Sequence, residues 1–281
     1  MSTVTCSAAS AAADEPLAGT APRVDTFLLV EVRGVWERDA IDAFPEDVAT
    51  RVRTWLDATA QSRLLLIRRP DRREGDLVVF VVRAVESPPS IHRFALRGLD
   101  DLLELELEAG GEPVDDPLVL VCGHGRRDAC CARLGVSLFE ALQDQLGPAS
   151  LWLSSHQGGH RFAPNLLWLP EGLSLGRVHS SDAPSVVAGL RAGRLPLENL
   201  RGFVTYSAEA QAAEIAVRER FCLGQLGDVS LVASEGGRVR LATSAGVVDV
   251  EVVTEPGPPL PASCGAEPEP GRRHVVSRIQ P

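Results

Sequence analysis

The sequence predicts an α/β protein with two related halves, each of element order β-α-β-β-β-α, followed by a helical segment and a small β unit. Two observations predict this fold. Short apolar runs alternate with longer segments of helical spacing, and the alternation occurs twice along the chain. The chain has 281 residues, of which 44% are hydrophobic, so it can bury the core of one large domain or two small ones.

The first half is expected at residues 23–110, after a flexible arm at residues 1–22 that is rich in Ala, Ser and Pro. Thr26–Val32 predicts a buried strand. Residues 40–60 have helical spacing, and Pro45 marks the start of the main helical portion. Three further strands and a Leu-rich helix complete this half. They are expected at Leu64–Ile67, Leu77–Val82, Ile91–Leu96 and Leu99–Leu107.

The second half, residues 111–225, repeats this order and adds a C-terminal helix. The expected elements are Leu118–Val121 (strand), Ala132–Leu146 (helix), Leu151–Ser154 (strand), Asn165–Leu169 and Ser174–Val178 (hairpin), Pro184–Ala192 (helix) and Ala208–Phe221 (helix). Cys222, just after the last helix, is expected to be buried. Residues 226–281 should form a small β unit, from alternating residues in Val229–Val253, and a proline-rich extended tail that contains Cys264.

Two cysteines and two histidines follow neighbouring strands of the second half. Cys122 and Cys131 lie in CGHGRRDACCARLG, and His156 and His160 lie in SSHQGGHRFAPN. Thiolate and imidazole favour zinc or iron–sulfur chemistry, and strand ends position such ligands well. A helical turn for the histidines is disfavoured, because each of the two intervening glycines costs about 1 kcal/mol in a helix interior. We therefore expect a tight loop.

Other interpretations of these residues remain open at this stage. Cysteine is often a small buried hydrophobe, and a histidine is usually an ordinary core or surface residue. The pattern fits a structural Cys2His2 zinc site as well as an iron–sulfur cluster. A thiol oxidoreductase is less favoured, because the thiols do not form a CxxC pair. No convincing carboxylate pair for glycosidic chemistry stands out, and we expect no catalytic residues.

These motifs, CGHGRRDACCARLG and SSHQGGHRFAPNLLWLP, resemble those of the sucrase/ferredoxin-like family. The resemblance implies a thioredoxin-like ferredoxin that binds a [2Fe–2S] cluster. Carried over by position, the ligands would be Cys122, Cys131, His156 and His160. The family spacing points to Cys131 rather than Cys130, which would be a packed or spare thiol. The resemblance also extends to CSAAS and PASCG near the two ends of the chain, which raises a partnership between Cys6 and Cys264.

Both halves would then be thioredoxin-like, with the first as a cluster-free copy. In that alignment EVRGVWERDAI takes the place of VCGHGRRDACC, and RRPDRREGD takes the place of SSHQGGHRFAPN. Cys6 by itself is expected to be an ordinary thiol on the flexible arm. The other histidines are not expected to be ligands: His92, His124, His179 and His274. Arg126, Arg127 and Asp128 are expected to shape the loop between the cysteines and to supply charge near a cluster.

The predicted function is one-electron transfer or redox sensing, with imidazole protonation coupled to reduction. The electron donor and acceptor would be other proteins that the sequence does not identify, and it does not predict the oligomeric state. A net charge of −10 argues against general nucleic-acid binding. No apolar run is long enough for a membrane span, and the first residues do not resemble a secretion signal. Six cysteines in a chain of this length fit a reducing cytoplasm better than a disulfide scaffold.

Overall fold

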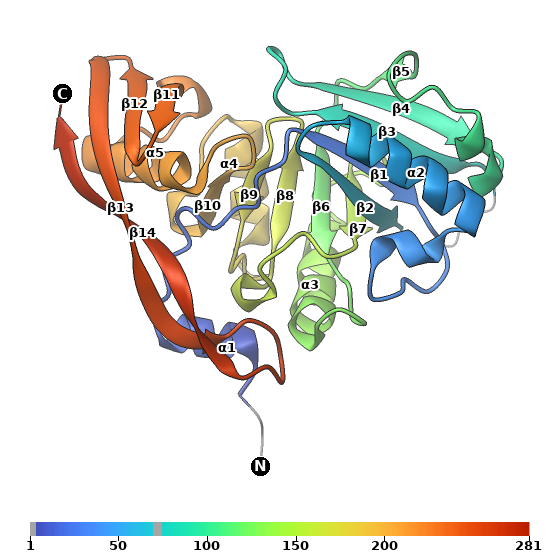
Figure 1. The fold of residues 1–281 in the computed structure, drawn as a ribbon, viewed down its shortest axis with the longest axis horizontal. Helices are drawn as coiled ribbons and strands as arrows, with labels where there is room; N and C mark the ends of the chain where they lie inside the picture. The colour runs from blue at the N-terminus through green and yellow to red at the C-terminus, as the bar shows by residue number, and fades with distance from the viewer. Residues whose placement is uncertain (1–3, 70–74, 281) are drawn as a thin grey trace.

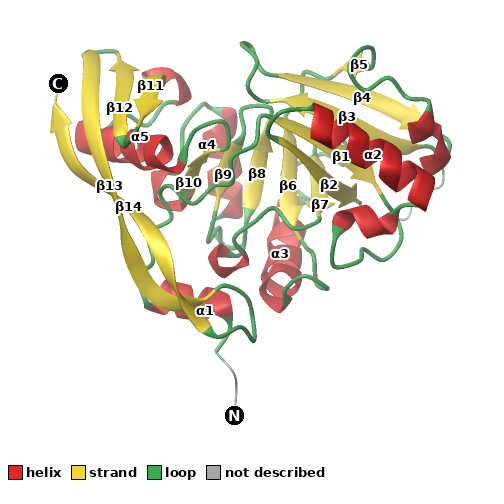
Figure 2. Cartoon of the chain, in the orientation of Figure 1, coloured by secondary structure: helices red, strands yellow, loops and turns green. Residues whose placement is uncertain are grey.

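The computed structural model describes residues 4–69 and 75–280. The fold is mixed α/β, with a ten-stranded sheet, helices packed on it and a separate four-stranded sheet (Figures 1 and 2). The strand order of the large sheet is β10-β9-β8-β6-β7-β2-β1-β3-β4-β5. Its strands are β1 (Thr26–Glu31), β2 (Ser62–Arg68), β3 (Leu77–Arg83), β4 (Ser90–Leu96), β5 (Glu112–Pro113), β6 (Leu118–Cys122), β7 (Leu151–Ser154), β8 (Leu166–Leu169), β9 (Leu173–Leu175) and β10 (Leu200–Phe203).

The two halves of the large sheet have the same strand pairing. In the first half, β1 runs parallel to β2 and antiparallel to β3, and β3 pairs antiparallel with β4. In the second, β6 runs parallel to β7 and antiparallel to β8, and β8 pairs antiparallel with β9. The halves join where β2 pairs antiparallel with β7, with Ile67 opposite Ser154. The predicted repeat of elements therefore appears as a repeat in strand pairing.

Each parallel pair is connected by a helix that covers one face of the sheet. These helices are α2 (Glu46–Ala58) and α3 (Ala129–Leu142). Val48 and Val52 of α2 and Leu138 of α3 are fully buried in one cluster with residues of β1 and β6, and α4 (Ala183–Arg191) joins the same cluster. Burying each such side chain contributes about 1.5–3 kcal/mol, so this layer holds the strand ends in fixed positions.

The small sheet packs on the long C-terminal helix α5 (Ala208–Phe221), mainly through Ala213, Val217, Val239 and Leu241. Its last two strands form a long hairpin that extends away from this sheet and reaches helix α1 (Cys6–Ala12) near the other end of the chain (Figure 1). The four strands are β11 (Val229–Glu235), β12 (Arg238–Thr243), β13 (Gly246–Pro261) and β14 (Pro268–Gln280).

Two predicted helices differ in their bounds from the observed ones. The helix expected over Leu99–Leu107 is a single 3-10 turn, Leu99–Leu103, because Leu and Glu alternate from Leu103 onward, and that alternation is not helical spacing. At residues 40–60 the predicted start of the main helical portion at Pro45 is confirmed, because Pro45 caps α2 and a short 3-10 turn, Ala40–Ala43, precedes it. Helix α3 starts three residues earlier than predicted, at Ala129, because the Asp128 carboxylate caps it.

Two cysteines also lie in other surroundings than expected. Cys6, predicted to be on a flexible arm, is fully buried on α1. Cys222, predicted to be buried, is exposed, and it ends α5 in the left-handed conformation (φ 57°). Across residues 4–69 and 75–280, no helix combines the length and the hydrophobicity that a bilayer crossing requires.

Candidate metal centre

The four predicted ligands lie at one edge of the sheet. Cys122 is the last residue of β6, and Cys131 is in the first turn of α3. His156 lies just after β7, and His160 begins a 3-10 turn, His160–Phe162. Because β6 and β7 are parallel, with Cys122 opposite Ser154, the carboxyl ends of both strands meet at this edge.

The structure brings three of the four predicted ligands together from two separate segments and stacks the fourth, His160, on His156. One ligand atom from each of Cys122, Cys131 and His156 lies within 4.8 Å of the others. The His160 ring stacks on the His156 ring, with 4.5 Å between centroids and 27° between planes. Cys130 belongs to a different group of side chains, with Cys6. The adjacent thiols Cys130 and Cys131 therefore face different surroundings.

The thiols and the imidazoles differ in burial. Cys122 and Cys131 are each 1% exposed, whereas His156 and His160 are half-buried. Each histidine has a buried Nδ1 atom without a hydrogen-bond partner among the described residues. An unsatisfied buried polar atom costs about 1–3 kcal/mol, and metal binding is one way to satisfy it. Two thiols and two free imidazole nitrogens are a suitable donor set for zinc or iron.

Electrostatics favour the ligating forms of these side chains. Hydrogen bonding from Cys131 and the nearby His156 hold the pKa of the Cys122 thiol well below its ordinary value, although burial opposes this shift. The same hydrogen bond, together with burial, raises the pKa of Cys131. Cys122 is therefore readily deprotonated to the thiolate, and Cys131 keeps the proton of the hydrogen bond between them. Burial lowers the pKa of His160, which favours neutral imidazole, the form that binds metals.

Close packing at one glycine positions the two cysteines relative to each other. Helix α3 crosses the end of β6 at Gly135, and a Cβ atom there would lie 1.9 Å from the carbonyl oxygen of Cys122. Only glycine permits this approach. The backbone N–H of Cys122 donates to the carbonyl of Asn165 (3.1 Å), which fixes the end of β6 from the other side.

The histidine loop has the tight glycine turn that the sequence predicts. Gly158 and Gly159 have φ values of 100° and 71°, in the left-handed region. The Asn165 side chain donates to the carbonyl of Gly159 (3.1 Å). A Cβ atom at Gly159 would lie 2.5 Å from the guanidinium of Arg201, so the loop wraps closely around that side chain.

Two arginines that no sequence motif marks support this loop. Arg201 is 1% exposed and donates to the carbonyl of Gly158 (3.0 Å) and to Oδ1 of Asn165 (3.1 Å). Burial lowers its pKa to about 9. Arg63, on β2 of the first half, donates to the carbonyl of His156 (2.9 Å). Neither arginine lies in a motif of its own, so only the folded structure reveals these roles.

A third histidine contacts the same loop. The backbone N–H of His156 donates to Nδ1 of His124 (3.3 Å), and the His124 ring packs edge-on against Trp36 (5.8 Å between centroids). His124 is 2% exposed, and burial lowers its pKa. A cavity of about 180 Å³ opens beside His124 and His156 and is also lined by Arg38, Arg63 and Arg127.

The loop between the cysteines is held to the first half by two surface ion pairs. Arg126 pairs with Glu37, and Arg127 pairs with Asp39 (2.9 Å). All four side chains are substantially exposed, so each pair contributes at most about 1 kcal/mol. These arginines therefore shape the loop by pairing with acidic residues of the segment that follows β1.

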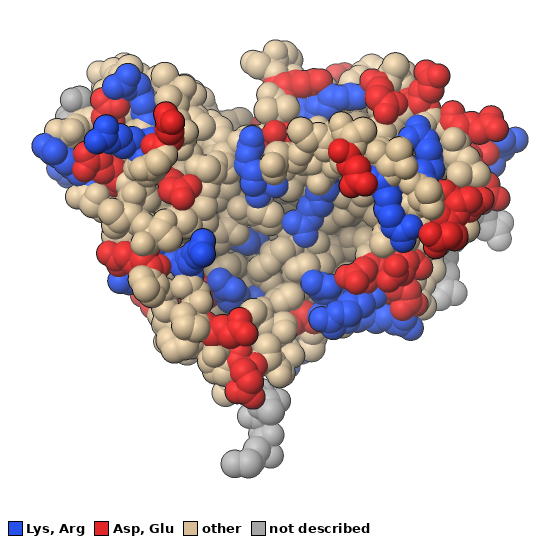
Figure 3. Space-filling model, in the orientation of Figure 1, with Lys and Arg blue, Asp and Glu red and all other residues tan. Residues whose placement is uncertain are grey.

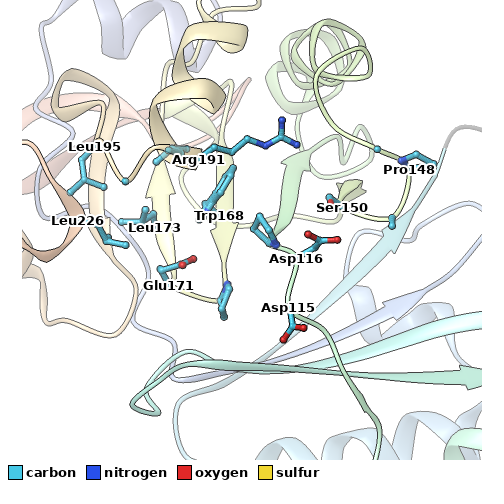
Figure 4. Close-up of a pocket in the computed structure, with 16 residues that line it drawn as sticks. Asp115, Asp116, Pro148, Ser150, Trp168, Glu171, Leu173, Arg191, Leu195 and Leu226 are labelled. Carbon is cyan, nitrogen blue, oxygen red and sulfur yellow. The ribbon is translucent and has the colours of Figure 1, made fainter.

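A larger cavity lies away from these residues. Its volume is about 670 Å³, and it is situated at the amino end of β6, the end opposite Cys122 (Figure 4). Asp115, Asp116 and Glu171 line it, together with Trp168 and Arg191, and burial raises the pKa of Glu171. The length of β6 separates this cavity from the predicted ligands.

Comparison with known proteins gives one family match. The model of the family described as sucrase/ferredoxin-like matches residues 17–202, about two thirds of the chain. Among curated proteins, the chain is similar to proteins named altered inheritance of mitochondria protein 32. The one from Meyerozyma guilliermondii is 28% identical over 155 residues, 48% of this chain and 55% of the relative.

Two further relatives of that name match shorter regions. The protein from Eremothecium gossypii is 31% identical over 110 residues, 34% of this chain and 35% of the relative. The one from Saccharomyces cerevisiae is 33% identical over 99 residues, 31% of this chain and 32% of the relative. The matched region thus spans about a third to a half of these curated relatives. No solved structure matches the chain.

Proposed function

Because the chain belongs to the sucrase/ferredoxin-like family, we propose that it is a one-electron carrier or redox sensor that holds a [2Fe–2S] cluster. The ligands would be Cys122, Cys131, His156 and His160. One observation carries the proposal: a buried thiol pair and a half-buried imidazole pair meet at one sheet edge, and both imidazoles have an unsatisfied buried Nδ1 atom. When bound, the cluster would supply reversible uptake of one electron.

The burial of the ligands would decide which side of the site exchanges electrons and protons, and the ligand type would set the reduction potential. The two cysteines exclude water from one side of the site, because each is 1% exposed. The half-buried histidines form the side that faces the surroundings, so electron and proton exchange would pass through them. Imidazole in place of thiolate removes negative charge, and it raises the reduction potential to about −150 to +300 mV in Rieske centres.

Positive side chains near the histidine loop would raise the reduction potential further. Arg201 and Arg63 donate to the carbonyls of Gly158 and His156, which places two guanidinium groups next to this loop. A positive charge near the site favours the reduced state, because reduction adds a negative charge.

The surface beside His156 would accept an acidic region of a redox partner. Arg38, Arg63 and Arg127 line the small cavity there, together with Asp39, which pairs with Arg127. Figure 3 shows arginine side chains interleaved with acidic ones over the segment that follows β1. Such a mixed surface suits a weak, salt-sensitive encounter with a donor or acceptor protein, and the net charge of −10 disfavours nucleic acid as the partner.

Two finer proposals accompany this function. Each half of the large sheet would be a thioredoxin-like unit, which the repeated strand pairing supports, with the cluster in the second half alone. The protein would work in a reducing compartment such as the cytoplasm, because all six of its cysteines are free thiols.

Anaerobic purification with metal and sulfide analysis tests the proposal. We expect about two iron ions and two acid-labile sulfides per chain at this site, and the red-brown colour of a [2Fe–2S] protein. Stoichiometric zinc bound by Cys122 and the histidines, with no sulfide in protein made with adequate iron, would overturn it in favour of a structural Cys2His2 zinc site.

A further inference from the structure

A second group of possible metal ligands lies next to the candidate cluster site, and it joins both ends of the chain to the start of α3. Cys6 begins α1, Cys264 lies in the turn between β13 and β14, and Asp128 and Cys130 lie at the start of α3. One ligand atom from each of the four residues lies within 4.8 Å of the others. Figure 1 shows α1 and the β13–β14 turn side by side at the lower end of the molecule.

The three sulfur atoms form a nearly regular triangle. The Sγ–Sγ distance is 3.3 Å between Cys130 and Cys264, and 3.6 Å from Cys6 to each of them. An Asp128 carboxylate oxygen lies within 4.8 Å of all three sulfurs, and Oδ1 is 3.3 Å from the Cys264 sulfur and 3.8 Å from the Cys6 sulfur. Cys6, Asp128 and Cys130 are buried, and Cys264 is half-buried.

These spacings match a tetrahedral site for one ion. Thiolates about 2.3 Å from a tetrahedral zinc ion lie about 3.8 Å apart, and a carboxylate oxygen lies about 3.5 Å from each sulfur. The observed distances are within about 0.5 Å of those values. A disulfide explains the arrangement less well, because it would join two of three equally spaced thiols and leave the third unpaired.

The carboxylate is held in place for such a role. Its Oδ1 accepts a hydrogen bond from the backbone N–H of Cys130, and its Oδ2 accepts one from the backbone N–H of Cys264, both at 2.8 Å. Each oxygen keeps a lone pair. The Ser7 hydroxyl donates to the Cys130 sulfur (3.1 Å), which orients that ligand from outside the triangle.

We propose that Cys6, Cys130, Cys264 and Asp128 form a second, mononuclear metal site that binds zinc and fastens both ends of the chain to the start of α3. A closed set of four protein ligands leaves no open position for a substrate, so the role is structural. Cys130 and Cys131 are consecutive, so a ligand of the proposed zinc site would be joined to a ligand of the proposed cluster by a single peptide bond. The zinc would thereby fix the N-terminal turn of the helix that carries Cys131.

Metal analysis of the full chain, purified anaerobically with iron and zinc supplied, tests this proposal. We expect about one zinc per chain beside the iron. Cys264→Ser should lose the zinc and keep the iron and sulfide, whereas Cys131→Ser should lose the iron. The matched control is Cys222→Ser, which changes an exposed cysteine and should keep both metals.

A spectroscopic measurement covers the case in which a variant folds poorly. Co²⁺ added to the zinc-depleted, iron-loaded wild type should bind at one equivalent and give the strong visible and thiolate charge-transfer absorption of tetrahedral cobalt, and zinc should displace it. Wild-type protein with intact iron and no zinc, and without a Co²⁺ signal, would overturn the second site alone. A disulfide among the three cysteines, found by peptide mapping of alkylated protein, would also overturn it.

Discussion

The two halves of the large sheet have the same strand pairing, but only the second half carries soft ligands at the edge where β6 and β7 end. The register places Glu31 of β1 where Cys122 stands in β6, because Glu31 lies opposite Ile67 and Cys122 lies opposite Ser154 in the matching parallel pairs. This corrects by one residue the alignment that the sequence suggested, in which Val32 matched Cys122. The site is therefore a property of individual residues at the strand ends.

At these positions the first half uses charged side chains instead of metal ligands. Glu31 is buried, accepts a hydrogen bond from the backbone N–H of Val78 (3.1 Å) and pairs with Arg33 (3.3 Å). By the same register Arg69 corresponds to His156, and its guanidinium lies over the Trp152 ring, 4.1 Å from the centroid. The comparison shows how one framework serves structure in one half and, as we propose, redox chemistry in the other.

The largest expected effect comes from substituting, one at a time, the two residues at corresponding strand ends. Cys122→Ser should reduce the iron content from about two per chain to near zero, because it removes a buried ligand. Glu31→Gln, at the corresponding position, should keep the iron, although it costs stability because it removes the charge of a buried carboxylate that pairs with the more exposed Arg33. Iron analysis and circular dichroism of both variants check this. Equal iron loss in two folded variants would contradict the functional difference between the halves.

The next effect tests the close approach of α3 to β6. Gly135→Ala should destabilise the protein by about 1–3 kcal/mol and lower cluster occupancy, because the new methyl group would overlap the Cys122 carbonyl. Gly189→Ala on α4 is the matched control: its Cβ would meet only ordinary contact at 3.5 Å, so the change should stabilise by up to about 1 kcal/mol. Denaturant unfolding measures both. A Gly135→Ala variant as stable as the wild type would show that α3 docks differently.

A smaller effect tests what the first half contributes to the site. Arg63→Gln removes the positive charge that contacts the carbonyl of His156. Iron content should stay unchanged, while the reduction potential should fall by tens of millivolts, on the order expected for one partly screened charge nearby. Arg93→Gln, which changes an exposed arginine of β4, is the control. An unchanged reduction potential in Arg63→Gln would mean that the first half supports the site structurally and does not affect its potential.

The smallest expected effect concerns the surface contact between the halves. Asp39→Asn should cost at most about 1 kcal/mol, and less at high salt, because its partner Arg127 is paired with it at an exposed position. Denaturant unfolding at low and high ionic strength measures the difference. A loss of several kcal/mol would mean that the loop between the cysteines depends on this pair.

Much of the fold was accessible from the sequence, because buried strands and amphipathic helices have clear periodicities. The patterns located β1, β7 and α5 closely. The helix expected over Leu99–Leu107 was wrong, because a Leu-rich composition obscured a spacing of two. The early start of α3 was also missed, although Asp128 is a recognisable capping residue.

The local motifs predicted a candidate site, but they did not predict the long-range contacts of the arginines that support it. The glycine turn before His160 followed from conformational preference. By contrast, Arg201 and Arg63 reach the site only through packing of distant segments, and no local pattern encodes such proximity. From the residues alone, Cys6 was interpreted as an ordinary thiol on the arm. The family resemblance raised its partnership with Cys264, and the structure places the two sulfur atoms 3.6 Å apart.

A redox titration across neutral and alkaline pH tests the central claim, ligation by two histidines, most directly. An imidazole proton is held more tightly in the reduced state, so the wild-type potential should fall as pH rises, by up to about 59 mV per pH unit for each coupled proton. His156→Cys and His160→Cys, if the cluster assembles, should lower the potential and flatten this slope, because thiolate adds negative charge and removes the titrating ring. A constant wild-type potential that both cluster-containing variants match would contradict histidine ligation.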